Sequence, residues 1–294
     1  MISDPERVRL LLRTAPMPPV PGAVPGETDI RWLRSQVPRF RDGAEHHRRR
    51  AAVQRELDRL DPELLRASAR TRAGHPLAHV RTLLAALNLP ESAAESVALV
   101  AAAYQPHQPI TPAADAAVAD LVTLCRAAIR HDRVDIEWRT DSDTGSAGPG
   151  TAYRHSAFDS TGQGRGDRAS AGHTDRYNIS GSDDTSTSDS RVVALICVLV
   201  QACSATGELI AAARAFDDVP VAGRASLVMA VAPPLRSTRR RVNGVATELD
   251  LRHPGLGFGV GPHRCPGSAH ATAIATGVLE GEAADPVGGL WRRA

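Results

Sequence analysis

The sequence contains no lysine, so all 35 of its basic residues are arginine. Because 33 acidic residues nearly balance them, the net charge is only +2, which excludes the strongly basic surface typical of nucleic-acid-binding proteins. Aromatic residues make up 3% of the chain and hydrophobic residues 42%, so aliphatic side chains must build most of the core. The 294 residues suffice for one large domain or two smaller ones.

Cysteine is also scarce, with four residues and no C-x-x-C pair. This spacing excludes a disulfide framework and the paired ligands of a structural zinc site, and it predicts free thiols in a reducing compartment. Any function of a cysteine must therefore be individual. The four residues are Cys125, Cys197, Cys203 and Cys265.

Long uninterrupted apolar runs are lacking as well. The first ten residues carry charges and no apolar stretch, so we predict no secretory signal and a cytoplasmic protein without a membrane partner. The strongest apolar segment, Val192 to Phe216, is interrupted by Gln201, Ser204 and Glu208, and we expect it to be too short to span a bilayer. It predicts a buried central helix.

The pattern along the chain predicts a mainly α fold with little β structure. Residues 1–27 are a Pro-rich lead-in or linker, and 28–138 carry successive amphipathic helical patterns. Residues 139–190 are rich in Gly, Ser, Thr and Asp, which predicts a low-complexity, disordered insert without a packed core. Residues 191–294 combine the central helix with a Gly-rich loop that contains Cys265.

This loop carries the clearest chemical signal. Glycines 257, 259 and 261 permit close backbone approach to a ligand, and Cys265 stands directly before Pro266, at the predicted start of a helix. Backbone amides at a helix start lower the pKa of a thiol, so we expect Cys265 to be a thiolate. Two alternatives are a structural cysteine in a turn, and a zinc site that adds His263 and either His253 or His270.

The loop resembles the F-G-x-G-x-H-x-C-x-G heme-binding signature of the cytochrome P-450 enzymes. It matches at Phe258, Gly259, Gly261, His263, Cys265 and Gly267. The resemblance implies a truncated P-450-like helical fold with heme b as cofactor, formed by 28–138 and 191–294. It also implies that Cys265 is the axial thiolate ligand, that Phe258 packs beside the sulfur, and that His263 contacts a heme propionate.

Two further segments are similar to family motifs that bind propionates. Glu45 to Arg50 resembles E-H-x-R-x-R, and this implies propionate contacts for His46 and Arg50. Taken alone, such a basic run is more typical of a solvated helix face. The segment from Pro233 to Arg240 resembles the strand that supplies a further arginine, for which we prefer Arg239 to Arg240.

The sequence also departs from the family pattern. In the central helix Thr206 is retained, but Ala205 replaces the acid that precedes it in the family, which puts ordinary oxygen activation in doubt. Thr206 has a catalytic role by resemblance, or its hydroxyl simply bonds back into its own helix. The E-x-x-R motif is absent, with Leu227 and Ala230 at its positions.

The resemblance implies a monooxygenase of bacterial secondary metabolism that takes electrons from a ferredoxin-type donor. Its substrate would be a small molecule, free or bound to a carrier. The missing acid leaves open a peroxide-dependent reaction or a redox-neutral rearrangement. A different hypothesis is a catalytically inactive heme-binding protein that acts as a sensor, carrier or partner, and a third is a degraded reading frame.

Overall fold

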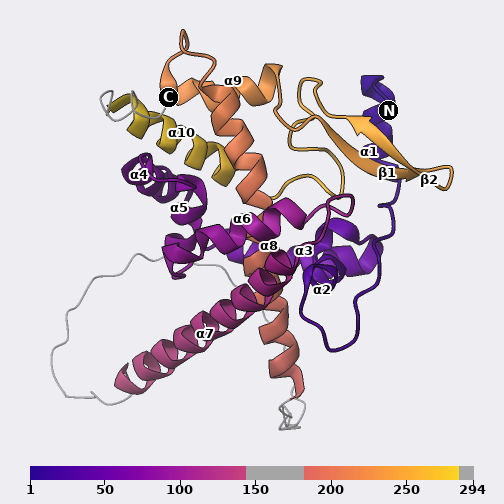
Figure 1. The fold of residues 1–294 in the computed structure, drawn as a ribbon. Helices are drawn as coiled ribbons and strands as arrows, with labels where there is room; N and C mark the ends of the chain where they lie inside the picture. Colours follow the sequence, from indigo (N-terminus) through magenta and orange to yellow (C-terminus); the bar gives the residue numbers. More distant parts are fainter. Residues whose placement is uncertain (144–181, 285–294) are drawn as a thin grey trace, which may run out of the picture.

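The computed structural model describes residues 1–143 and 182–284, with side chains for 1–132 and 188–284. This part of the chain is mainly helical and has one two-stranded sheet, as the sequence predicts (Figure 1). The helices are α1 (Pro5–Thr14), α2 (Ile30–Gln36), η1 (Pro38–Phe40), α3 (Gly43–Leu57), α4 (Pro62–Arg72), α5 (Ala78–Ala86), η2 (Glu91–Ala93), α6 (Ala94–Ala103), α7 (Pro112–Asp143), α8 (Ser182–Ala213), α9 (Val221–Val231) and α10 (Ser268–Ala284). The strands are β1 (Ser237–Val242) and β2 (Val245–Asp250).

An Asp-Pro pair begins both α1 and α4. The Asp4 carboxylate accepts a hydrogen bond from the Arg7 amide at 2.8 Å, and Asp61 accepts one from the Glu63 amide at 2.8 Å. Each aspartate satisfies an amide that the first helical turn leaves without a partner, and the proline after it is preset for the helix. The helix break predicted at Asp61 is confirmed.

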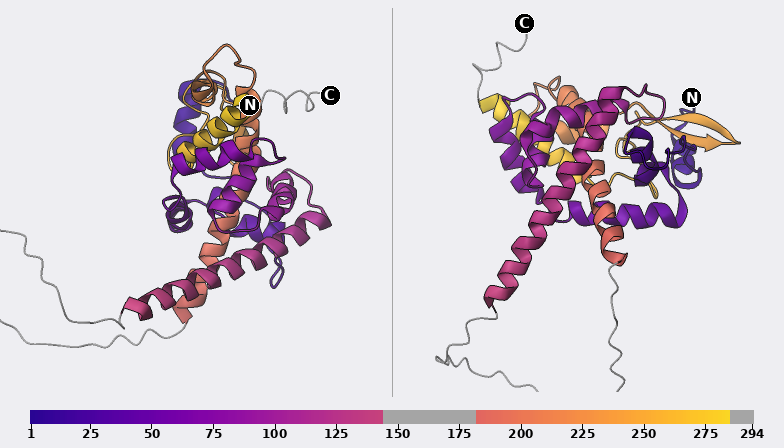
Figure 2. Two further views of the ribbon diagram at one scale, coloured as in Figure 1. Left: turned by 90° about the vertical axis from the view of Figure 1, so that its left-hand side faces the viewer. Right: turned by 60° about the horizontal axis from the view of Figure 1, so that its bottom comes forward.

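Helix α8 is the centre of the molecule, and it is packed against α3, α5, α6, α7, α9 and α10 (Figures 1 and 2). Residues 192–200 form a fully buried run in contact with α3, α6 and α7. The segment Ser188–Ala213 is long and apolar enough to cross a bilayer, so the expectation that it is too short is wrong. However, 67% of its most apolar stretch is buried inside the protein, as in the core helix of a folded domain. The predicted buried central helix is confirmed.

Helices α4 and α10 pack closely against each other. The contact depends on Gly277 and Gly281, because a side chain at either position would overlap the α4 backbone. A bidentate ion pair flanks this contact, in which Arg66 Nε donates to Glu280 at 3.0 Å. α10 follows the Cys265 loop directly, so this packing fixes one end of the loop.

The Arg-rich segment after α9 forms a hairpin with β2. β1 and β2 pair antiparallel through a two-residue turn at Asn243 and Gly244, where both residues have positive φ. This is the turn chemistry expected for a type I′ hairpin.

The Pro-rich lead-in does not behave as a linker. Ile2 bridges to Leu249, and Val8 and Leu12 pack with Leu249 and Leu256 in a small cluster that is separate from the main helical core. The segment packs because the residues before the prolines form helix α1, which has an apolar face that includes Val8 and Leu12. Residues 1–14 are therefore packed into the fold, against β2 and the segment that follows it.

The edges of the predicted insert 139–190 are helical, because α7 extends to Asp143 and α8 begins at Ser182. The central part of this prediction, residues 144–181, lies outside the described residues.

Candidate functional site

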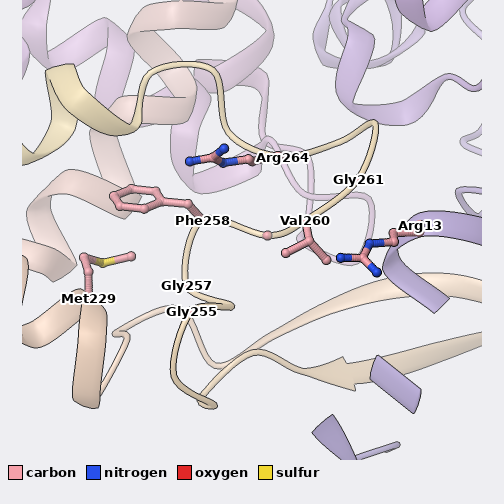
Figure 3. A pocket seen from close by; sticks show the side chains of 9 residues that line it. Arg13, Met229, Gly255, Gly257, Phe258, Val260, Gly261 and Arg264 are labelled. Carbon is pink, nitrogen blue, oxygen red and sulfur yellow. The ribbon is translucent and has the colours of Figure 1, made fainter. Parts of the chain in front are cut away.

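The Cys265 loop connects β2 to α10 and folds back on itself. The Cys265 amide donates to the Phe258 carbonyl at 2.8 Å, and Gly259 and Gly261 adopt positive φ values of 68° and 77°. A Cβ on Gly261 would lie 3.0 Å from Cα of Arg13, so this glycine permits α1 to pack against the loop. Figure 3 shows Arg13 beside the loop.

Cys265 differs from the other cysteines by its exposure. Its side chain is accessible to solvent, whereas Cys125 and Cys197 are buried, and burial raises the pKa of each of these two to about 12. Desolvation by the surrounding protein also raises the pKa of Cys265, although the Gly267 amide and the charge of Arg50 lower it. The expectation of a lowered pKa is therefore wrong in its net direction, since loss of water outweighs the helix start.

A pair of histidines joins α3 to the loop. The rings of His46 and His263 lie 4.1 Å apart between centroids, and His263 Nε2 donates to the Asp42 carboxylate at 3.2 Å. Burial, followed by the influence of His46 and Arg240, lowers the pKa of His263 to about 4, and burial lowers the pKa of His46. The structure thus brings together the two histidines that the motifs single out, and both are uncharged at neutral pH.

The histidines of the zinc alternative are used elsewhere. His253 bonds to the Ser3 carbonyl at 2.7 Å, and His270 bonds to the Leu57 carbonyl at 3.0 Å. Across the described ranges no three His, Cys, Asp or Glu side chains are placed to hold a metal ion. The zinc alternative therefore has no support.

Strand alternation decides between the two candidate arginines of β1. Arg239 is exposed and pairs with Glu248 across the hairpin at 3.6 Å. Arg240 points to the other side, is 3% exposed, and interacts electrostatically with His46 and Asp42. The geometry reverses the predicted preference for Arg239, because successive side chains of a strand face opposite sides.

Arginines surround the thiol. Arg39 and Arg50 both interact with the charge of Cys265, and burial together with the charge of Arg39 lowers the pKa of Arg240 to about 10. The Nε atoms of Arg39 and Arg240 are buried without a hydrogen-bond partner. Asp42 is the acid in contact with this group, so an anion is needed to offset the cost of the unpaired donors. A group with two carboxylates, such as heme, fits this requirement.

The sequence analysis did not identify Arg39. Its signal is a single arginine between two residues, Pro38 and Phe40, that are both buried. A charged residue between two apolar residues does not by itself predict a cationic site, so the sequence alone did not single out Arg39.

Thr206 on α8 is 1% exposed, and its hydroxyl has no hydrogen-bond partner, so the alternative of a bond back into its own helix is not observed. The α8 residue that interacts electrostatically with Cys265 is Cys197, because the charge of Cys265 contributes to raising the pKa of Cys197. Nine residues separate Cys197 from Thr206, about two and a half turns, and this places them on opposite sides of the helix. A role for Thr206 at the site stays a prediction.

Two cavities flank the loop, and Phe258 and Arg264 line both. One is about 460 Å³ and includes Met229 and Arg13, and the other is about 530 Å³ and lies between α4, α9 and α10. The Phe258 ring points to the side of Met229 (Figure 3). Packing of Phe258 beside the sulfur therefore stays a prediction.

No protein-family model matches the sequence, and no curated protein matches it. Solved structures of similar fold are cytochrome P-450 structures. P450BioI, in complex with an acyl carrier protein that carries hexadec-9Z-enoic acid, has a TM-score of 0.61 at 12% identity, over 94% of this chain and 83% of that one. CalO2 has a TM-score of 0.58 at 12% identity, over 94% and 80%. The fold is therefore P-450-like, as predicted.

Proposed function

We propose that the chain is a heme-thiolate oxidoreductase of the cytochrome P-450 type. The observation that carries the proposal is the convergence of an accessible thiol, Cys265, with the buried Nε atoms of Arg39 and Arg240, which have no hydrogen-bond partner, inside a P-450-like fold. Such a site needs a bound group that offers a metal to the sulfur and carboxylates to the cations. Heme b supplies both, and its iron supplies the oxidative chemistry.

The residues of the chain divide this work among themselves. Cys265 would ligate the iron, and Arg50, Arg240, His46 and His263 would hold the two propionates. Arg240 takes the place first assigned to Arg239, because Arg240 is the buried member of the strand. Gly259, Gly261 and Gly267 would keep the backbone close to the porphyrin, with Phe258 near the sulfur. Thr206 would offer its free hydroxyl.

For its reaction, we propose a monooxygenase step on an organic substrate, with two electrons from a ferredoxin-type donor. A substrate bound to a carrier is supported by P450BioI, which was solved with a loaded acyl carrier protein. A cytoplasmic role in bacterial secondary metabolism fits such a substrate. An inactive heme-binding protein is the second candidate, and the alanine at position 205 favours it.

The test is the absorption spectrum of purified, heme-loaded protein after reduction and exposure to carbon monoxide. We expect the red-shifted band of thiolate-ligated heme, which Cys265→Ala abolishes and Cys125→Ala, a buried control thiol, retains. Equal spectra from the two variants would contradict the assignment. Turnover with an electron donor then separates the oxidoreductase from the inactive heme-binding protein.

A further inference from the structure

The larger cavity beside the Cys265 loop is lined by three helices together with two residues of the loop. It measures about 530 Å³ and lies between α4, α9 and α10. From α10 it is lined by Ser268, Thr272 and Thr276, which recur at every fourth residue and therefore share one side of the helix. Its volume falls within the range of about 300–1,000 Å³ that small-molecule pockets have in proteins.

The cavity lies next to the close contact between α4 and α10. The two helices touch at Gly277, where a Cβ would overlap the Arg66 carbonyl oxygen, and the cavity begins beside this contact at Thr276. Nearer the start of α10 it is lined by Ala269 and Ala273, whose short side chains leave the space between the helices unfilled. Small residues of α10 therefore determine where the cavity lies.

One polar group of this cavity is buried and has no partner. Thr276 is 4% exposed, and within the described part of the chain its hydroxyl forms no hydrogen bond. Thr272, one turn earlier, instead donates to the Ser268 carbonyl of its own helix at 3.0 Å. A buried hydroxyl without a partner is costly, so Thr276 indicates a bound group that forms a hydrogen bond with it.

The cavity also has one positive charge that no acid offsets. Arg66 donates from Nε to Glu280 at 3.0 Å, and its Nη1 lies 3.7 Å from Glu63 Oε2. Arg264 is exposed and has no carboxylate partner among the described residues. Its guanidinium points to the same side of the loop as the Phe258 ring (Figure 3), and both side chains line the cavity. A guanidinium pairs with a carboxylate through two parallel hydrogen bonds, so a ligand carboxylate fits this position.

These two groups stand at opposite ends of the cavity. Arg264 is in the loop that leads into α10, whereas Thr276 is eight residues beyond Ser268, the first residue of that helix. Eight residues of helix rise about 12 Å, so a ligand that reaches both groups must be elongated. Between them α10 contributes its two lining alanines, and the loop adds the Phe258 ring. The arrangement suits an apolar chain with one charged end and one neutral polar end.

We propose that this cavity is a binding site for an elongated carboxylate. The carboxylate pairs with Arg264, the apolar chain lies along the alanines of α10 and Phe258, and a hydroxyl or carbonyl at the far end bonds to Thr276. Neither Arg264 nor Thr276 has a role in the proposed binding of heme. The inference therefore goes beyond the proposed function and does not require it.

Isothermal titration calorimetry of the full chain, with and without heme, tests the class of ligand. The probes are ω-hydroxydecanoate, decanoate, which lacks the far hydroxyl, and α,ω-decanediol, which lacks the carboxylate. We expect ω-hydroxydecanoate to bind about 10-fold more tightly than the diol and about 5-fold more tightly than decanoate, because each of these lacks one anchor. Equal affinities for the three probes, or no binding, would overturn the proposal.

Two variants and a control locate the bound probe. Arg264→Gln changes an exposed residue and should leave folding intact, but it should weaken both carboxylates about 10-fold and leave the diol unchanged. Thr276→Val should lower the affinity for ω-hydroxydecanoate to that for decanoate, and leave decanoate unchanged. Arg241→Gln, at an exposed residue of β1 outside the cavity lining, should change no affinity. Equal affinities in Arg264→Gln and Arg241→Gln would refute the site.

The same samples separate this site from the proposed function. A missing thiolate band with the expected probe affinities would overturn the heme assignment alone. A thiolate band with probe affinities that neither Arg264→Gln nor Thr276→Val changes would overturn the carboxylate site alone. If Arg264→Gln weakens binding of an acidic electron-donor protein and leaves the carboxylates unchanged, Arg264 belongs to a protein contact and the carboxylate site is refuted.

Discussion

Replacing Arg240 by glutamine should make the heme-free protein more stable and its heme affinity lower. Arg240 is 3% exposed, its Nε has no partner, and its pKa is about 10 against 12.5 for a free guanidinium. A tenfold change in an ionisation constant corresponds to about 1.4 kcal/mol, so keeping this cation charged costs the folded state roughly 3 kcal/mol. The hydrogen bond from Arg240 to the Arg239 carbonyl, at 2.9 Å, offsets part of that cost.

If this bond contributes about 1 kcal/mol, removing the guanidinium should stabilise the heme-free protein by about 2 kcal/mol. The folded state binds its proton less tightly than the unfolded chain, so the free energy of unfolding of the parent protein should rise as the pH increases from about 10 toward 12.5. The Arg240→Gln variant should lack this rise. A bound propionate loses a charged partner in the variant, so the dissociation constant for heme should increase about 10- to 100-fold.

Urea unfolding of the heme-free protein and absorption titration with heme measure the two effects separately. Arg239→Gln is the matched control, because Arg239 neighbours Arg240 but is exposed, and its ion pair with Glu248 contributes little. The reasoning is refuted if Arg240→Gln destabilises the heme-free protein, or if both variants bind heme equally well.

Three other predictions concern stability. Gly277→Ala should cost about 3 kcal/mol in urea unfolding, because its methyl overlaps the α4 backbone, whereas Gly267→Ala, 3.6 Å from the Leu57 methyls, should cost under about 1 kcal/mol. The free energy of unfolding of the heme-free protein should fall by about 3 kcal/mol as the pH falls from 6.5 to 4, because the unfolded chain protonates His263 in this range and the folded state does not. A His263→Gln variant whose free energy of unfolding depends on pH as in the parent protein would contradict this. Val8→Ala should destabilise the protein by about 2 kcal/mol and lower heme retention, and equal retention would refute a role of α1 at the loop.

The sequence predicts the helical class and the central helix because these follow from local patterns. Apolar periodicity over 192–216 and the Asp-Pro pair at 61 and 62 do not depend on distant residues, and both interpretations are confirmed. The fold family also follows from the motif around Cys265, which similar structures support at the level of fold.

The rest depends on contacts between segments that are far apart in the chain. The choice between Arg239 and Arg240 needs the strand register against β2, and a shift by one residue exchanges their faces. The environment of Arg39 could not be predicted, because Arg39 interacts with the charges of Arg240 on β1 and of Cys265 in the loop, which are both far from it in the chain. The pKa of Cys265 depends on how much water its neighbours displace, which a helix-start rule does not include.

The contact between α1 and the Cys265 loop also has a consequence for the order of folding. His253 bonds to Ser3 across 250 residues, and closing a loop of that length costs roughly 5 kcal/mol of chain entropy. The small cluster of Val8, Leu12 and Leu256 supplies the compensating burial without sharing the main core. This cluster should therefore form late and open first, by local unfolding that leaves the helical core intact. Hydrogen exchange at the amides of this cluster would then be faster than in α8.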